Sequence, residues 1–117
     1  MPVLKIHIDQ RFDDAVRERG QTLIETLSAV LVGGLAADPA KCQILLLPGA
    51  MVSPAYPLYV DLQFRANSRR GSAQIDATLA RIAGILEAQF HCAIRLRAFA
   101  LDESMLFALD HSPEVPQ

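Results

Sequence analysis

Two runs of the order strand, helix, strand, separated by a proline-rich loop, constrain the fold of this chain more than any other feature. In residues 3–8 alternate side chains are apolar, which predicts a half-buried strand. Apolar residues then recur at spacings of three, four and seven from Val16 to Leu31, which predicts an amphipathic helix. The unbroken apolar run Ile44–Leu47 predicts a second strand that is buried on both faces.

The second half of the chain repeats this order after a loop at residues 49–57. Leu58–Arg65 alternates most regularly, and a helix with Ser72 as its candidate N-cap follows. Cys92–Leu101 then alternates as a fourth strand. In the first half, we expect Gly33-Gly34 to cap the helix and Pro48-Gly49 to end the second strand.

Each half therefore reads as one βαβ unit, and each helix is long enough for a right-handed crossover. The 117 residues are predicted to form a single α+β domain in which two helices cover one face of a four-stranded sheet. We expect the units at about residues 2–48 and 58–101, followed by a C-terminal segment at 102–117.

This arrangement leaves the second face of the sheet uncovered. The second strand is apolar on both sides, and Met105–Leu109 is too apolar for a free tail. The simplest cover is another copy of the chain, so we expect a homo-oligomer.

Composition excludes several classes of function. The formal net charge of −2 gives no basic field for nucleic acid, and no apolar stretch reaches the length of a membrane span. With no secretory signal and two isolated cysteines, we expect a cytoplasmic protein. His7 and His91 lack further ligands at metal spacing, and there is no glycine-rich phosphate loop, so no metal or cofactor is expected.

The proline at position 2 is the most reactive candidate. If Met1 is removed, Pro2 carries a secondary amine at the start of an ordered strand, where it could act as a general base. The alternative is that Met-Pro is an ordinary start with no chemical role.

Pro2 on its strand, Leu62-Gln63-Phe64 before an arginine-bearing turn, and Phe90-His91 at a helix–strand junction together resemble the tautomerase superfamily. This family includes 4-oxalocrotonate tautomerase and macrophage migration inhibitory factor. The chain looks most like the 5-carboxymethyl-2-hydroxymuconate isomerase branch, which implies aromatic compound degradation. The resemblance also implies a homotrimer without a cofactor, in which the proline moves a proton on a small anionic enol or α-keto acid.

The resemblance further implies cationic partners for a substrate carboxylate. The family arginine in the turn after the third strand corresponds to Arg69 or Arg70. The family arginine near the start of the second strand is missing, and Lys41 could replace it as a point charge.

Three interpretations remain open on the sequence alone. The chain could be a proton-transferring isomerase, or a trimer of the same fold that only binds a partner. It could also be a ferredoxin-like domain that binds a ligand or RNA, in which the two halves pair in a different order. Arg95 and Arg97 share one strand face and could line a subunit interface or an anion pocket.

Overall fold

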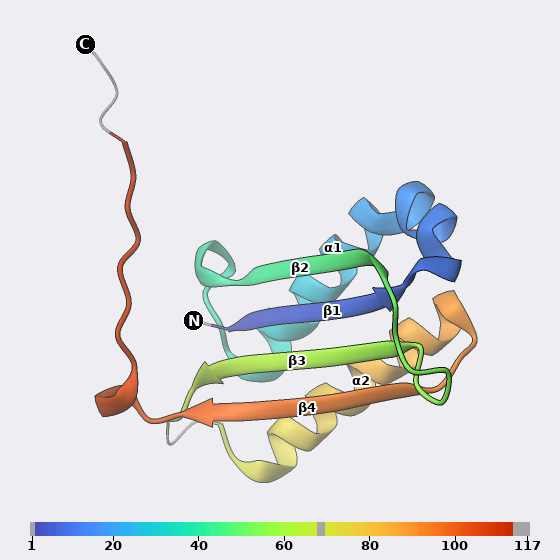
Figure 1. The fold of residues 1–117 in the computed structure, drawn as a ribbon. Helices are drawn as coiled ribbons and strands as arrows, with labels where there is room; N and C mark the ends of the chain where they lie inside the picture. Colours follow the sequence, from blue (N-terminus) through green and yellow to red (C-terminus); the bar gives the residue numbers. More distant parts are fainter. Residues whose placement is uncertain (1, 68–69, 114–117) are drawn as a thin grey trace.

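Four strands form one mixed sheet in the order β2-β1-β3-β4, and both long helices lie behind it in Figure 1. The structure is a computed structural model and describes residues 2–67 and 70–113. β1 (Val3–Asp9) pairs in parallel with β2 (Gln43–Ala50), and β3 (Leu58–Arg65) pairs in parallel with β4 (Ile94–Leu101). β1 and β3 are antiparallel, which joins the two βαβ units into one sheet. The predicted two-layer α+β fold is confirmed.

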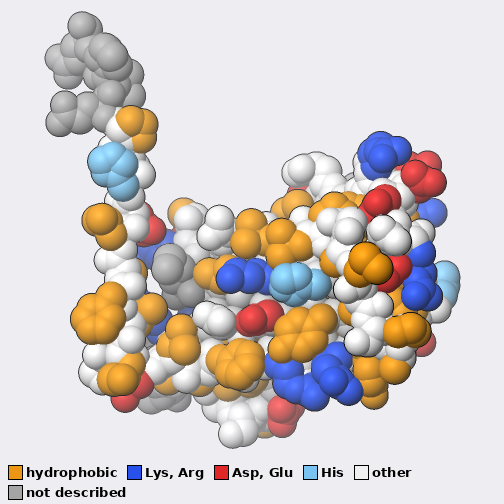
Figure 2. All heavy atoms as spheres, in the orientation of Figure 1, with side chains coloured by type: hydrophobic (Ala, Val, Ile, Leu, Met, Phe, Trp, Pro, Cys, Tyr) orange, Lys and Arg blue, Asp and Glu red, His pale blue; other side chains and the backbone are white. Residues whose placement is uncertain are grey.

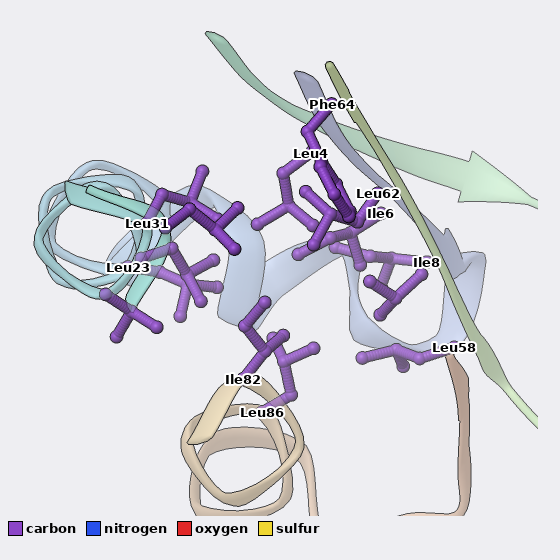
Figure 3. Packing of buried hydrophobic residues seen from close by; sticks show 14 of the residues in the cluster. Leu4, Ile6, Ile8, Leu23, Leu31, Leu58, Leu62, Phe64, Ile82 and Leu86 are labelled. Atoms are coloured by element: carbon purple, nitrogen blue, oxygen red, sulfur yellow. The ribbon is translucent and has the colours of Figure 1, made fainter. Parts of the chain in front are cut away.

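The core lies between the sheet and the two helices, α1 (Asp13–Leu35) and α2 (Ser72–Phe90). Every second residue of β1 and β3 is buried against them, and Figure 3 shows these side chains meeting leucines and isoleucines of both helices. The sheet contributes Leu4, Ile6, Ile8, Leu58, Val60, Leu62 and Phe64 to this core. The intervening side chains face away from the helices, and we call this side of the sheet the open face.

α1 continues past the glycine pair that was expected to end it. It runs to Leu35 and ends at Ala36, whose backbone is left-handed with φ 51°. The expected cap at Gly33-Gly34 is wrong because Gly34 is required inside the helix, where a Cβ would overlap the Thr78 hydroxyl of α2. α2 begins at Ser72 with Gly71 as the N-cap residue, so Ser72 does not cap it.

β2 also extends further than expected, through Pro48 and Gly49 to Ala50. His7 pairs with Leu47 and Asp9 with Ala50, so β2 carries an extra residue here and bulges. An edge strand tolerates the proline, and the positive φ of Gly49 accommodates the bulge. The connecting loop is therefore residues 51–57.

Two carboxylates hold this loop and the bulge in place. Asp9 Oδ1 accepts a hydrogen bond from Val52 N–H at 3.2 Å, and Asp13 Oδ1 accepts one from Gly49 N–H at 2.9 Å. Asp9 Oδ2 accepts from the backbone N–H and the Nε of Arg11, both at 3.0 Å. The three hydrogen bonds that Asp9 accepts, from Arg11 and Val52, lower its pKa. The bond from the Arg11 backbone N–H has the largest effect.

Three short 3-10 helices complete the described structure: η1 (Gln10–Phe12), η2 (Pro39–Lys41) and η3 (Glu103–Met105). After η3 the chain runs extended past the ends of the strands and away from the sheet (Figure 1). Within the described residues, neither long helix is apolar enough over its length to span a bilayer.

Candidate active site

Pro2 is buried at the head of β1, between the start of β2 and the end of β3. Its carbonyl accepts a hydrogen bond from Gln43 N–H of β2 at 3.0 Å. On the other side, the antiparallel register pairs Val3 with Gln63, and continuing this register places Pro2 beside Phe64 of β3. The hydrogen bond to β2 and the register with β3 therefore position Pro2 at the head of β1.

Arg70 lies at this same end of the sheet and is held by backbone carbonyls. Its Nε donates to Leu35 O at 3.0 Å and its Nη1 to Arg65 O at 2.7 Å. Its guanidinium carbon lies 5.7 Å from the centre of the Phe64 ring. A planar guanidinium with several donors can bridge two carbonyls in this way. Arg70 is therefore a fixed, half-buried positive charge next to Phe64, the β3 residue beside Pro2.

Arg69, the other arginine expected from the turn, lies outside the described residues. Lys41 closes η2 and its side chain is exposed. It lines an open hollow of about 420 Å³ at the start of β2, together with Ala40, Cys42, Gln43 and Asp110. The structure thus brings Lys41 to the Pro2 end of the sheet, but at its surface.

Cys42 lies next to Lys41 at the Pro2 end of the sheet. The sequence analysis did not identify it as part of the site. It directly precedes Gln43, whose N–H binds Pro2, and burial raises the pKa of its thiol, with a smaller opposing effect from the charge of Arg70. Its Sγ donates to Asp38 O at 3.5 Å. A thiol with a raised pKa is a poor nucleophile, so Cys42 contributes apolar bulk to the site.

Phe64 entered the sequence analysis only as part of Leu62-Gln63-Phe64, one of the stretches that carry the family resemblance. The structure shows that its ring also supports Arg70, through a cation–π contact. The sequence did indicate the Phe64–Arg70 contact, because the arginine pair follows shortly after the end of the alternating strand that contains Phe64.

The remaining cationic candidates lie on the open face. Arg95 stacks over the Tyr56 ring at 4.2 Å, and Arg97 donates to Leu96 O at 2.8 Å. In register, Arg95 pairs with Tyr59 near the far end of β3 and Arg97 pairs with Asp61 at its middle. These arginines therefore belong to a different surface from Pro2 and Arg70.

Chemically, the Pro2 end combines a buried proline, the apolar side chain of Phe64 and a fixed positive charge. Such a setting favours the neutral form of an amine and attracts an anion. Among residues 2–67 and 70–113, three or more His, Cys, Asp or Glu side chains nowhere gather in a way that could hold a metal ion.

No known family model matches the chain, and no curated protein sequence matches it. Solved structures do resemble it. A fused 4-OT, solved as a wild-type asymmetric trimer, superposes with a TM-score of 0.73 at 19% identity over 91% of each chain. A macrophage migration inhibitory factor-like protein from Entamoeba histolytica gives 0.68 at 12% identity over 95% of each chain.

A member of the cis-3-chloroacrylic acid dehalogenase family gives a TM-score of 0.71 at 12% identity, covering 96% of this chain and 84% of that one. Another similar structure, at 18% identity, TM-score 0.70 and 89% of each chain, is of a protein inactivated by 2-oxo-3-pentynoate. These likenesses show that the chain has the fold of the tautomerase superfamily.

Proposed function

We propose that the chain is a cofactor-independent tautomerase or isomerase that moves a proton on a small anionic enol or α-keto acid. The observation that carries this proposal is the position of Pro2. It is buried at the head of β1 beside Phe64, and the Arg70 guanidinium lies over the Phe64 ring. Removal of Met1 would convert the Pro2 nitrogen from an amide into a secondary amine. Pro2 is then the general base and, in the return step, the general acid.

The surroundings suit this role. An α-amine titrates near pH 8 when unperturbed, at about 7.7–8.0. Burial and a neighbouring cation both favour the neutral amine, so its pKa moves toward the working pH of a proton-transfer catalyst. Arg70 also supplies charge that would stabilise the enolate as it forms.

Lys41, Arg70 and Arg69 are the proposed contacts for the substrate carboxylate. Lys41 supplies a mobile point charge at the mouth of the hollow, whereas Arg70 is fixed by two carbonyls. With Lys41 at the position of the missing arginine, a substrate with one carboxylate fits this set better than a dicarboxylate. Likeness to the isomerase branch and a role in aromatic compound degradation are further parts of the proposal, and rest on Leu62–Phe64 and Phe90-His91. The cationic set departs from that branch, whose own substrate carries more than one carboxylate.

We also propose that the working unit is a homotrimer. The support is the apolar β2 edge, the exposed C-terminal segment and the trimeric form of a similar structure. A cytoplasmic location remains part of the same hypothesis.

The test is enol-to-keto conversion of phenylpyruvate by the wild type and by Pro2→Ala, with the N-terminal state of each sample read by intact mass. General bases contribute about 100-fold to 10,000-fold, so a loss of at least ~100-fold in kcat/KM is expected. Wild-type protein that lacks Met1 and converts the enol no faster than Pro2→Ala would refute the proposal.

A chemical probe gives an independent measure. A secondary amine adds to the triple bond of 2-oxo-3-pentynoate, and the carbanion that forms takes up a proton, so no oxidant is required. We expect one adduct on the peptide that starts at Pro2, and none when Met1 is retained. Labelling at Cys42 or Cys92 in its place would contradict the proposed reactivity, since burial raises the pKa of both thiols.

A second candidate function is a binding module of the same fold without proton transfer. The observation that favours it is that Arg70 uses Nε and Nη1 to bridge backbone carbonyls, which is also a purely structural role. Protein from its natural host that retains Met1 would favour this function, because Pro2 would then have no basic nitrogen.

A further inference from the structure

The hollow at the Pro2 end of the sheet is lined from two distant parts of the chain. Lys41 and its neighbours lie at the start of β2, whereas Asp110 belongs to the segment that follows β4. We call that segment, residues 102–110, the tail. It leaves β4 and passes the strand ends at which Pro2 lies (Figure 1), and in Figure 2 the surface is hollowed between it and the body of the protein. Among the described residues that line this hollow, Lys41 is the only cation and Asp110 the only carboxylate.

The course of the tail is set by the turn at its base. Asp102 Oδ1 accepts hydrogen bonds from the N–H of Ser104 at 3.0 Å and from its hydroxyl at 2.9 Å. These bonds lower the pKa of Asp102, the backbone bond most strongly, and they close η3 beside the end of β4. Extended residues 106–110 span about 17 Å, and the three strand spacings from β4 to β2 add to about 14 Å. The tail is thus just long enough to cross the strand ends and bring Asp110 to the start of β2.

The tail also places carboxylates against the cations of this end. Glu103 Oε1 lies 3.7 Å from Arg65 Nη1, and Asp110 lines the same hollow as Lys41. Arg70 donates its Nε and Nη1 to backbone carbonyls. A substrate carboxylate that enters the hollow therefore meets one mobile cation, Lys41, and a second carboxylate on the same molecule meets Asp110.

Two negative charges in one hollow repel each other measurably. At a separation of about 6 Å, the repulsion of two unit charges corresponds to about threefold in a dissociation constant in bulk water. The effective dielectric constant near a protein surface is lower, so the factor there is larger. Because Asp110 is exposed to solvent and its charge is partly screened, we expect a factor of about threefold to tenfold. An uncharged group in the same place meets no such repulsion.

We propose that Asp110 determines the substrate class of the site. Its charge makes the hollow select enol and α-keto acids that carry one carboxylate and an uncharged far end, and reject acids that carry a second carboxylate. This inference rests on the proposed function, and it adds the residue responsible for the selection and its physical cause. Lys41 binds the first carboxylate, and Asp110 repels the next one.

Binding of two matched acids tests this selection without any reaction. Sorbate and trans,trans-muconate are both six-carbon diene acids. They differ only at the far end, which is a methyl group in sorbate and a carboxylate in muconate. Titration calorimetry at low salt should show that the wild type binds sorbate more tightly, by about threefold to tenfold. The preference should shrink at high salt, because ions screen exposed charges.

Three variants separate the charge of Asp110 from other effects. Asp110→Asn keeps the shape of the side chain and removes its charge, so the two acids should bind within about twofold of each other. Asp110→Lys places a cation there, and muconate should then bind more tightly than sorbate. Asp14→Asn is the matched control, because it removes a carboxylate that is 92% exposed at the start of α1, at the opposite end of the sheet. It should keep the wild-type preference.

A matched pair of substrates gives the second measurement. 2-Hydroxymuconate and 2-hydroxy-2,4-hexadienoate differ by the same terminal carboxylate. Asp110→Asn should raise kcat/KM for the dicarboxylate relative to the monocarboxylate by about threefold to tenfold. Intact mass shows whether each sample has lost Met1, which the proposed function requires.

Several results would overturn the inference. A wild type that binds both acids equally well would do so, as would Asp110→Asn protein that keeps the preference for sorbate. A wild type that binds neither acid would also do so, since the hollow then takes no carboxylate.

The two proposals fail separately. Active protein whose substrate ratio is the same in Asp110→Asn refutes only the role of Asp110. Protein that lacks Met1 and converts neither enol, but loses its preference for sorbate in Asp110→Asn, refutes only the enzyme.

Discussion

Alanine substitutions at two adjacent glycines of α1 should have opposite effects on stability. At Gly33 a Cβ would have no atom within 4 Å, whereas at Gly34 it would overlap the Thr78 hydroxyl of α2. Alanine is favoured over glycine inside a helix by about 0.8–1 kcal/mol, so Gly33→Ala should raise the free energy of unfolding by about this amount.

At Gly34 the same gain is outweighed by overpacking. The side chain of Thr78 is 1% exposed and its hydroxyl donates to Gln74 O at 2.9 Å, so it cannot move aside easily. Gln74 in turn donates to Gly34 O at 2.6 Å, which holds the two helices close. Overpacking costs about 1–3 kcal/mol, and the upper end applies here, so the net loss for Gly34→Ala is about 2 kcal/mol.

The assay is thermal and urea unfolding at one fixed protomer concentration, because self-association couples stability to concentration. For a chain of this length, 1 kcal/mol corresponds to about 4 °C in Tm. Gly34→Ala should therefore melt about 8 °C lower than the wild type and Gly33→Ala about 4 °C higher. Adding Thr78→Ala to Gly34→Ala should recover at least 1 kcal/mol in a double-mutant cycle.

If the two single variants differ by less than about 0.5 kcal/mol, the close contact between α1 and α2 does not exist as described. The same holds if Thr78→Ala and Gly34→Ala prove additive, because residues that clash must be coupled.

Three further predictions follow from backbone and charge. Ala36→Gly should raise the free energy of unfolding, measured in urea, by about 1 kcal/mol. Ala36 holds a left-handed backbone with φ 51°, which costs an L-residue about 1–2 kcal/mol. An unchanged urea midpoint would contradict this. Asp9 has a lowered pKa in the folded chain, so its stabilising effect is complete above its ordinary value of 3.8 and is lost as pH falls through the lower folded value. Asp9→Asn should thus be less stable than the wild type at neutral pH and approach it below about pH 4, and a constant difference across this range would refute the assignment. Arg70→Lys should lower the free energy of unfolding by about 2 kcal/mol, because an ammonium cannot bridge the two carbonyls that the guanidinium binds. The control is Arg81→Lys, on the exposed side of α2. If Arg70→Lys loses as little stability as this control, the bridge contributes little.

The local patterns of this sequence were sufficient for the elements and for the buried faces. Alternation in β1 and β3 assigns Leu4 and Leu62 to the core, and the two helical periodicities imply a crossover within each half. Pro2 could be identified as a candidate because its type and place in the chain are visible without any fold.

The positions of element ends required tertiary contacts. Gly33-Gly34 reads as a helix terminus, yet α1 continues because Gly34 is the point where α2 approaches, and Thr78 lies 44 residues away in the sequence. Pro48 and Gly49 read as the end of a strand, yet β2 continues because it is an edge strand and bulges against β1.

Sequence alone thus determined that this chain forms two βαβ units and that a proline opens the first of them, because periodicity and residue type are local properties. Only the tertiary structure decided that β1 and β3 pair antiparallel, which places Pro2 beside Phe64 and so near Arg70. It also decided that Arg70 is fixed by Leu35 O and Arg65 O while Lys41 stays exposed. Pairing order and long-range hydrogen bonds depend on residues far apart in the chain, and no short-range pattern encodes them.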